Sequence, residues 1–364
     1  MRTDNPFLTN LQRKRSSFAK FFVLLTTFFL CAVFAVNGFA LTVTGTAPTG
    51  GNQTALNTAF GKAVDELNKD ISKISSRPLG MVKGFGDAAV FGNHAATQRG
   101  YLDYKRLAFT AGTMAGLQVP GVQAMDIMDL HDNLIDNGDA KLGAHLQVWS
   151  AELGLHSDFL LEGLYLGFKF GFCAIDIPIS EDKMEWDYWN IGFLARYRFL
   201  GPVSARFASW NGLSVGTGLL YSNAKTNYSM YIGDFSGNDS GVRVDLDSSL
   251  YFAMKFHGWT MPLEIMTAVD LFFLTIHGGF GVDINWVFGK MDIGIKSSIE
   301  SSIPVSTPGS LTVGESMDNV KPTHFRPKLM AGLGFNAGAV VLDIPFTFYI
   351  GNGFSLGVSI GFVY

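Results

Sequence analysis

Hydrophobic and polar residues alternate with a period of two over the last residues of the chain. From Gly353 to Tyr364 the even positions hold Phe, Leu, Val, Ile, Phe and Tyr, and the odd positions hold almost only Gly and Ser. Successive side chains of a β-strand point to opposite faces, so this segment predicts a strand with one apolar and one nearly bare face. Such a strand fits a wall between lipid and a polar lumen.

The same alternation recurs along most of the chain after residue 104. A soluble β-sandwich also buries one face of each strand, but it would not place so many glycines opposite so many phenylalanines. The sequence therefore predicts an all-β transmembrane protein, an antiparallel up-and-down β-barrel of about 12 strands, with a range of 10 to 14. The expected strands are residues 105–118, 142–155, 160–175, 187–199, 212–223, 242–257, 262–274, 278–287, 291–301, 326–336, 340–350 and 354–364.

The first 40 residues have the composition of a secretory signal peptide. Five basic residues precede an apolar stretch from Phe21 to Val36, and Gly38 and Ala40 form a small-x-small cleavage site. An uncleaved membrane anchor, the alternative, normally has a longer apolar stretch. We expect three parts: a signal peptide (1–40), an N-terminal tether, helix and hatch-like segment (41–104), and the transmembrane barrel (105–364).

A helical pattern lies between the tether and the barrel. Apolar residues at steps of three and four predict an amphipathic helix over residues 55–74, and a Gly-rich stretch follows it. The charged face of this helix suits either a surface helix at the periplasmic end of the barrel or a hatch inside the lumen. Candidate plug residues are Phe60, Val64, Leu67, Asn93 and His94.

Charged residues of both signs alternate with the apolar residues in the expected strands. We interpret them as lumen-lining, because charges inside a barrel must be hydrated or paired. Two roles remain open: structural ladders of paired side chains, and rings of charge that select ions. The candidates are Lys169, Arg196, Arg198, Arg243, Asp245, Asp247, Lys255, Glu264, Asp270, Asp283, Asp292, Lys296 and Asp343, to which Glu300 belongs by position.

Charge and motifs argue against several classes of function. Removal of the first 40 residues changes the net charge from −4 to −8, whereas nucleic-acid binding requires a basic footprint. Cys173 is then the single cysteine, so neither an intramolecular disulfide nor a cysteine-based zinc site is possible. The GxSxG strings around Ser214, Ser355 and Ser359 lie within expected strands rather than at a strand-to-helix turn. We expect no enzyme activity, no catalytic residue, no cofactor and no metal site.

The C-terminal strand, which ends Gly361-Phe362-Val363-Tyr364, resembles the terminal assembly signal of bacterial outer-membrane proteins. The layout of export signal, helical and Gly-rich segment, and barrel resembles the long-chain fatty-acid transporters of the outer membrane. In that family an N-terminal hatch plugs the barrel and an Asn-Pro-Ala motif precedes the first strand. Here residues 91–96 read Phe-Gly-Asn-His-Ala-Ala, with His94 in place of the proline.

These features lead to an expected function and location. The resemblance implies an outer-membrane channel for uptake of small, hydrophobic, fatty-acid-like nutrients through a plugged barrel. The alternatives are a general diffusion porin and a surface-exposed adhesin or structural protein. Expected partners are outer-membrane lipid, a hydrophobic small molecule, and the barrel-assembly machinery, which would bind the C-terminal strand ending at Tyr364.

Loop lengths predict the orientation. With a periplasmic C-terminus, short turns near 156–159, 257–261, 289–290 and 336–338 and a longer connection at 201–211 lie in the periplasm, and longer loops at 119–141, 176–186, 224–241 and 302–325 lie outside.

Overall fold

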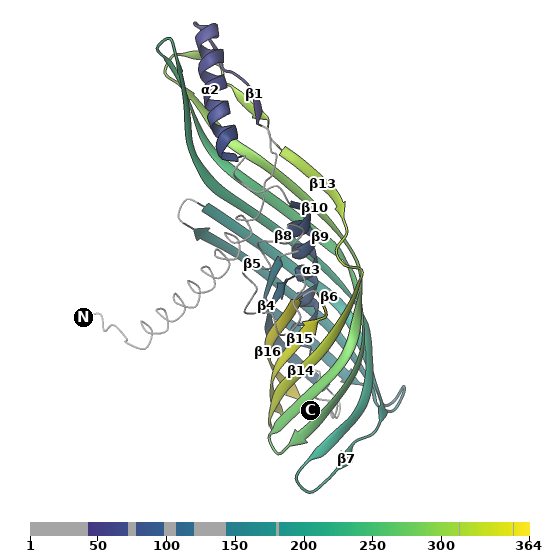
Figure 1. Ribbon diagram of the computed structural model, residues 1–364. Helices are drawn as coiled ribbons and strands as arrows, with labels where there is room; N and C mark the ends of the chain where they lie inside the picture. Colours follow the sequence, from purple (N-terminus) through teal and green to yellow (C-terminus); the bar gives the residue numbers. More distant parts are fainter. Residues whose placement is uncertain are drawn as a thin grey trace, which may run out of the picture.

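A closed ring of antiparallel strands dominates the structure (Figure 1). The computed structural model describes residues 43–71, 78–97, 107–119, 143–179, 182–312, 314–351 and 353–364. The main sheet has twelve strands, and all of them except the short β7 (Val203–Ser204) and β13 (Gly314–Val320) pair with neighbours on both sides. The ring strands are β3 (Leu107–Gln118), β4 (Gly143–His156), β5 (Leu164–Ile179), β6 (Asp182–Leu200), β8 (Ser209–Asp239), β9 (Val242–Leu271), β10 (Leu274–Ser301), β14 (Phe325–Ala337), β15 (Val340–Tyr349) and β16 (Gly353–Val363).

The first and last strands of the ring close the barrel. β3 pairs with β16, and Leu107 and Tyr364 exchange two backbone hydrogen bonds of 3.0 and 2.8 Å. We call this end of the barrel the base and the opposite end, where β8 turns into β9, the apex. The expected all-β barrel is confirmed, with strands that start and finish at the base.

The boundaries of several expected strands are wrong. The expected turns at 257–261 and 289–290 do not exist, because β9 and β10 pair without interruption from Leu271↔Leu274 to Val244↔Ser301. The expected loop at 224–241 is the apical half of β8. Four expected strands therefore merge into two, β9 and β10. The sheet nevertheless has twelve strands, because it also contains β7 and β13.

A row of aromatic side chains marks the apical edge of an apolar belt on the outside of the barrel. Ring centroids lie 5.0 to 5.3 Å apart for Trp149–Phe172, Trp189–Tyr221 and Tyr221–Trp259, and Trp259 stands opposite Trp286. From Trp259 to Leu271 at the base, β9 takes twelve residue steps, about 28 Å of height at the usual rise and tilt. That height matches the hydrocarbon thickness of a bilayer.

The apolar side of β9 switches from one face to the other at this aromatic row. Side chains at even positions point inward along the whole strand. Below Gly258 the inward residues include polar and charged ones, such as Thr260 and Glu264, beside Met266 and Ala268, whereas above it they are mostly apolar, such as Leu246 and Phe252. The belt therefore separates lipid from a polar lumen, and the extension above it has an apolar inner face and a wet outer face.

Six of the expected lumen-lining residues consequently point outward. They lie above the aromatic row, where the charged side of the strand faces water. Alternation alone does not distinguish a charged face in outside water from a charged face in a lumen. Lys290 and Asp292, 3.4 Å apart, show the same outward placement on β10. The corrected residues are Arg243, Asp245, Asp247, Lys255, Asp292 and Lys296, and Glu300 lies with them.

Helix α2 (Gln53–Ile71) covers the inner face of the extension, where the sequence predicted a helix over 55–74 (Figure 1). Its apolar stripe, which includes Phe60, Val64 and Leu67, packs with inward residues of β8 and β9, in one apolar cluster with residues of β10. These three plug candidates therefore lie outside the lumen, and their expected role as plug residues is wrong. A Cβ at Gly237 of β8 would lie 1.8 Å from the carbonyl oxygen of Ala59, so this close packing requires glycine.

The chain before α2 is also attached to the extension. β1 (Thr44–Thr46) pairs with β12 (Ser310–Thr312), and β2 (Thr49–Gly50) pairs with β11 (Val305–Thr307). On α2, the Lys62 ammonium donates a 3.0 Å hydrogen bond to Asp239 and holds the pKa of that carboxyl below its usual value. We call residues 43–71, together with the strand segments above the aromatic row and β11–β12, the apical lobe.

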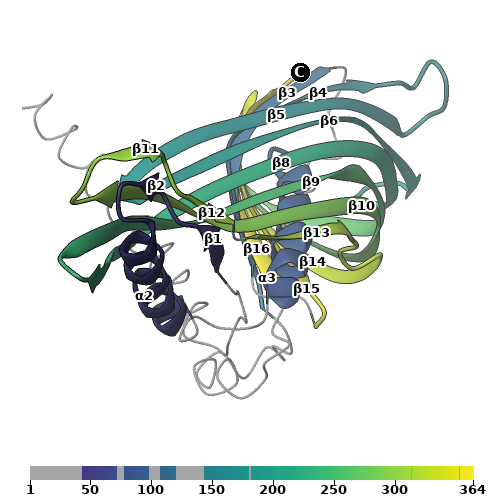
Figure 2. The same ribbon diagram turned by 90° about the horizontal axis from the view of Figure 1, so that it is seen from above.

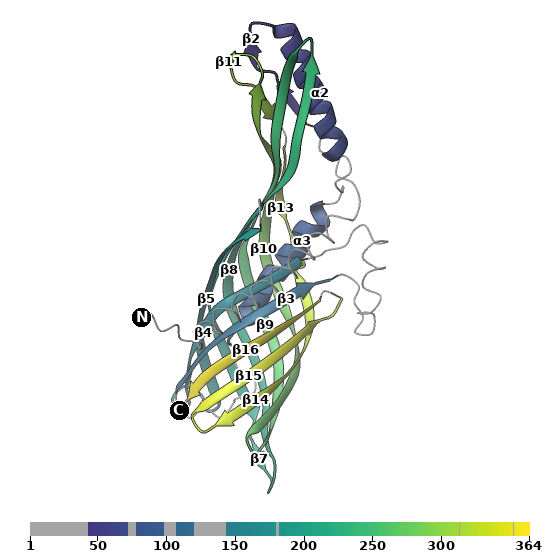
Figure 3. The same cartoon turned by 90° about the vertical axis from the view of Figure 1, so that its left-hand side faces the viewer.

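A short helix and a 3₁₀ turn continue the chain into the ring. α3 (Pro78–Ala89) contacts β3, β4, β8, β9 and β10, and η1 (Val90–His94) follows it directly. Figures 2 and 3 show α3 among the strands, with α2 displaced toward the apex. No helix among the described residues is both long and apolar enough to cross a bilayer. The expected signal peptide, residues 1–40, lies outside the described residues.

The two environments of β10 predict opposite responses to one substitution. Phe280 lies midway along the belt and Ser298 lies in the extension, and both are exposed on the outer face. Phe280→Arg should lower the free energy of unfolding by about 2–4 kcal/mol, because it places a charge at the bilayer midplane, whereas Ser298→Arg should change it little. Urea titrations in lipid vesicles measure both, and equal effects would contradict the placement of the belt.

Candidate functional site

Residues 84–97 fill the lumen, and we call them the lumenal segment. Every one of these residues is buried. Small side chains let the segment approach the wall: a Cβ at Gly92 would lie 2.3 Å from the His145 ring and 2.8 Å from that of Tyr188. Asn93 and His94, two of the expected plug residues, therefore lie inside the barrel.

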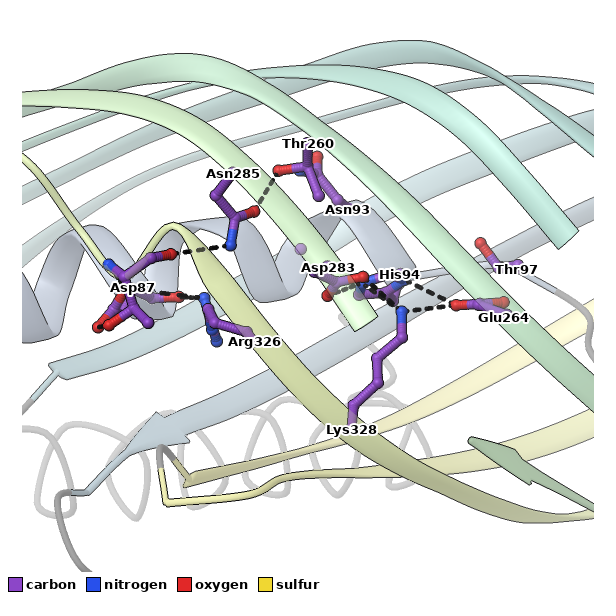
Figure 4. A network of polar contacts seen from close by, with 12 residues as sticks. Asp87, Asn93, His94, Thr97, Thr260, Glu264, Asp283, Asn285, Arg326 and Lys328 are labelled. Carbon is purple, nitrogen blue, oxygen red and sulfur yellow. Dashed lines mark hydrogen bonds and ion pairs between the residues drawn. The ribbon is translucent and has the colours of Figure 1, made fainter. Parts of the chain in front are cut away.

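A buried ionic cluster joins this segment to three strands (Figure 4). The Lys328 ammonium donates to Glu264 and to Asp283, each at 2.6 Å, and His94 lies 2.8 Å from the second oxygen of Asp283. Two carboxylates thus face one ammonium, which also lies 3.4 Å from Nε2 of His94. Isolated charges in such a place are costly, so the four groups depend on one another. We call His94, Glu264, Asp283 and Lys328 the Lys328 cluster.

Asp87 forms a second attachment, nearer the apex (Figure 4). Its carboxylate accepts hydrogen bonds from the Thr323 backbone N–H at 2.6 Å and hydroxyl at 2.8 Å, and its carbonyl oxygen accepts one from Arg326 at 2.6 Å. The Arg326 guanidinium lies 4.6 Å from the ring centroids of both Phe91 and Tyr349. Cation–π contacts of this kind strengthen when they are desolvated, as this one is.

Asn93 lies at the centre of an uncharged network. It donates to the Thr260 hydroxyl at 3.1 Å, and its carbonyl oxygen accepts hydrogen bonds from Tyr188 and Asn190, both at 3.3 Å. Thr260 in turn donates to Asn285 at 2.9 Å. An amide with both donor and acceptor sites filled by the wall holds the segment in one orientation.

Further contacts hold the segment toward the base. Thr110 of β3 donates to the carbonyl oxygen of Ala96 at 2.6 Å, and the Lys169 ammonium donates to the Thr97 hydroxyl at 2.6 Å. A cavity beside His94, Thr97 and Arg196 has a volume of about 10 Å³, which is room for about one water molecule. The contacts described here block this part of the lumen.

Among the described residues, the backbone ladder between β4 and β5 ends well below the apical ends of both strands, and we call this place the seam. Their pairing runs from His156↔Tyr165 up to Trp149↔Phe172 and stops there, although β5 continues to Ile179 along β6. Above that point the Trp186 indole N–H donates to the carbonyl oxygen of Leu146 at 3.2 Å. A side chain from a third strand therefore satisfies part of the β4 edge where the backbone ladder ends.

The structure divides the remaining charged candidates by depth. Lys169, Arg196, Glu264, Asp283 and Asp343 are buried in the lumen, and Arg198 and Asp270 point inward near the base with partial exposure. Asp343 pairs with His277 at 2.8 Å, and both side chains are fully buried.

The sequence analysis missed several residues of the site. Asp87, Glu152, His277, Arg326 and Lys328 all contribute to the lumen. Arg326 and Lys328 alternate with Pro327 and Leu329 in an expected strand, so the same rule that selected Lys169 would have found them. Among the described residues no cluster of His, Cys, Asp and Glu has the arrangement of a metal site.

Comparisons with known proteins identify a family and a set of similar folds. Residues 38–364 match the Lsa36-like family, and the chain belongs to it. No curated protein matches the sequence. Similar solved structures, which are outer-membrane β-barrels, include the translocator domain of the autotransporter NalP from Neisseria meningitidis (12% identity, 72% of this chain and 91% of that chain, TM-score 0.31), the transport unit of the autotransporter AIDA-I from Escherichia coli (8%, 80% and 99%, 0.27) and a Pseudomonas aeruginosa FadL homologue (8%, 79% and 98%, 0.24).

Removal of the cluster's ammonium should destabilise the barrel more than removal of an exposed one. We expect Lys328→Met to lower the free energy of unfolding by about 3–5 kcal/mol, because two carboxylates lose their partner. Lys290→Met, which breaks an exposed pair, should cost less than about 1 kcal/mol. Adding Glu264→Gln and Asp283→Asn to Lys328→Met should recover most of the loss. Urea titration monitored by tryptophan fluorescence measures all three, and a fully stable Lys328→Met protein would refute the role of the cluster.

Proposed function

We propose that this member of the Lsa36-like family is an outer-membrane barrel that its lumenal segment closes and that anchors the apical lobe at the cell surface. The main support for this proposal is that side-chain contacts attach the segment to the wall at successive depths, from Asp87 to Thr97. Without this segment, the polar inner face of the wall would enclose water. With its lumen filled by bonded side chains, the barrel serves as an anchor.

The orientation follows from the two ends of the barrel. We place the base in the periplasm, because barrels of this type have short periplasmic turns and longer extracellular connections. The basal connections have two residues (β9–β10 and β14–β15) to eight residues (201–208) between ring strands. At the apex β5–β6 and β8–β9 are also joined by two residues, but β8, β9 and β10 extend far above the aromatic row, and β10 and β14 are connected through residues 302–324. This orientation puts the apical lobe outside the cell.

The architecture of the apical lobe suits display outside the membrane. Its inner face is occupied by α2 and its outer face carries charges of both signs in water. A soluble-type sheet and helix held beyond the belt, on strands that include β8, β9 and β10, has no role in spanning the membrane. Contact with molecules outside the cell is the function that this placement serves.

The seam between β4 and β5 supports a second candidate function, gated uptake of small hydrophobic molecules such as fatty acids. A wall position without a backbone ladder opens at a lower cost than a paired one, since only side-chain bonds such as that from Trp186 to Leu146 must break. The seam lies above Trp149 and Phe172, at the edge of the lipid belt. In this scheme the lumenal segment moves when a ligand enters.

Two further partners remain proposals. Outer-membrane lipid would cover the belt, and the barrel-assembly machinery would bind the C-terminal strand that ends at Tyr364. The absence of enzyme activity and of nucleic-acid binding also remains a prediction.

Planar-bilayer conductance separates the closed anchor from an open pore. We expect no conductance from the full-length protein and clear conductance from a version that lacks residues 78–97, because the polar wall then encloses water. A version that lacks residues 53–71 is the matched control and should stay closed. An open full-length channel would disprove the proposal.

Fluorescence titration with a long-chain fatty acid tests the second candidate. Uptake predicts saturable quenching in the full-length protein that weakens in Trp186→Phe, because Trp186 lies at the seam. Trp210→Phe, which removes an indole near the base, is the control and should leave the quenching midpoint unchanged. Quenching that never saturates would count against uptake.

A further inference from the structure

The two ends of the lumenal segment lead to opposite ends of the barrel. Before it, β1, β2 and α2 are attached to the apical lobe. After it, β3 begins at Leu107, which is bonded to Tyr364 at the base. The chain therefore passes from apex to base before the first wall strand begins.

The contacts of the segment follow this direction in order. β9 and β14 both run from apex to base. Asn93 contacts Thr260 of β9, and the next residue, His94, reaches Lys328 and Asp283, at the level where Glu264 lies four residues farther down β9. Ala96 then contacts Thr110, three residues from the basal end of β3. Successive residues thus bind successively deeper positions of the wall.

The length of the connection excludes a route back over the apex. From Thr97 to Leu107 the chain takes ten Cα steps, which span at most about 35 Å. A path from mid-lumen over the apical rim and down the outside would have to cover more than the belt height of about 30 Å and the rise to the rim as well. The described residues therefore enter the lumen from the apical side and come nearest the base at Ala96 and Thr97, on the same side as the start of β3.

We infer that the barrel is the export route for its own N-terminal part. This inference rests on the proposed function, because it uses the same orientation. The chain crosses the membrane once inside the lumen, in addition to its wall strands, and residues 43–71 pass through as unfolded polypeptide. A folded lobe would not fit, since the single lumenal segment is buried along its whole length, from residue 84 to residue 97, against the wall.

The lobe has the properties that this route requires. Most of the stability of a helix in a protein comes from packing of its apolar face, and the apolar stripe of α2 packs mainly on β8 and β9. β1 and β2 likewise find their partners in β12 and β11. The N-terminal part therefore gains stable structure only where the apical strand ends are present, which is on the far side of the membrane.

Three open glycines allow a direct test of topology in the full-length protein. Gly51 precedes α2, Gly241 lies in the apical β8–β9 turn, and Gly338 lies in the basal β14–β15 turn. A side chain at any of them would meet nothing within 4 Å, but Gly241 (φ +77°) and Gly338 (φ +69°) have a left-handed backbone that cysteine adopts with strain, so these two variants should fold less completely. Cysteine is introduced at each position in a Cys173→Ser background, and intact cells are labelled with a membrane-impermeant maleimide. Only the SDS-resistant, folded fraction is counted, so a variant that fails to assemble does not contribute.

The labelling pattern tests the passage through the lumen and the proposed surface function separately. We expect Gly51→Cys and Gly241→Cys to be labelled and Gly338→Cys to be labelled only after lysis. If all three patterns invert, the orientation and the surface function are wrong, and with them export to the surface. If Gly51→Cys and Gly241→Cys lie on opposite sides, the passage through the lumen is wrong whatever the orientation.

A second measurement tests export as unfolded chain. A flexible epitope inserted after Gly51 should reach the surface at the level of the unmodified protein. A small disulfide-closed domain at the same site should block folding of the barrel by at least about tenfold, and a reductant present during synthesis should restore it. Equal display of the closed domain without reductant would overturn the inference.

Discussion

Backbone hydrogen bonding in lipid is the constraint on which the rest of this structure depends. A bilayer offers no partner for a free N–H or C=O, so strands can span it only as a closed ring. β3 and β16 meet that requirement at the point where the barrel closes. Closure then determines the rest of the layout: the outer face must be apolar, and the inner face becomes a cylinder that needs water or protein to fill it.

In this structure the lumenal segment fills the cylinder, and its contacts with the wall are polar. The Lys328 cluster and the Asp87 site place charges where an apolar plug of equal volume would avoid their desolvation cost. Such groups are stable only when each finds its partner, which gives the segment one register along the wall. His94 reaches Asp283 in that register, and a shift by one residue would leave both buried without each other.

Much of the fold could be predicted from residue alternation. The alternation could not predict whether each face of a strand contacts lipid, water or protein. Phe354 to Tyr364 and Val242 to Phe256 show the same period of two, yet the first set faces lipid and the second faces α2. The period determines which side chains share a face and carries no information about what covers it. For the same reason Arg243 and Asp283 were assigned to one lumen although they lie on opposite sides of the wall. Asn93 and His94 were found through a resemblance, whereas the partners of His94 required the three-dimensional register of β9, β10 and β14.

The apical lobe and the lumenal segment hold one chain at two separate places. The lobe fixes residues 43–71 through β1, β2 and α2, and the wall fixes residues 84–97 through its polar contacts. Between Ile71 and Pro78 the chain has seven Cα steps, about 25 Å at full extension. The lumenal segment can therefore move toward the base only until this link is taut, unless α2 also leaves the sheet. Withdrawal of the segment from the lumen therefore requires that α2 also leaves the sheet, so the lobe restrains the closed state of the barrel.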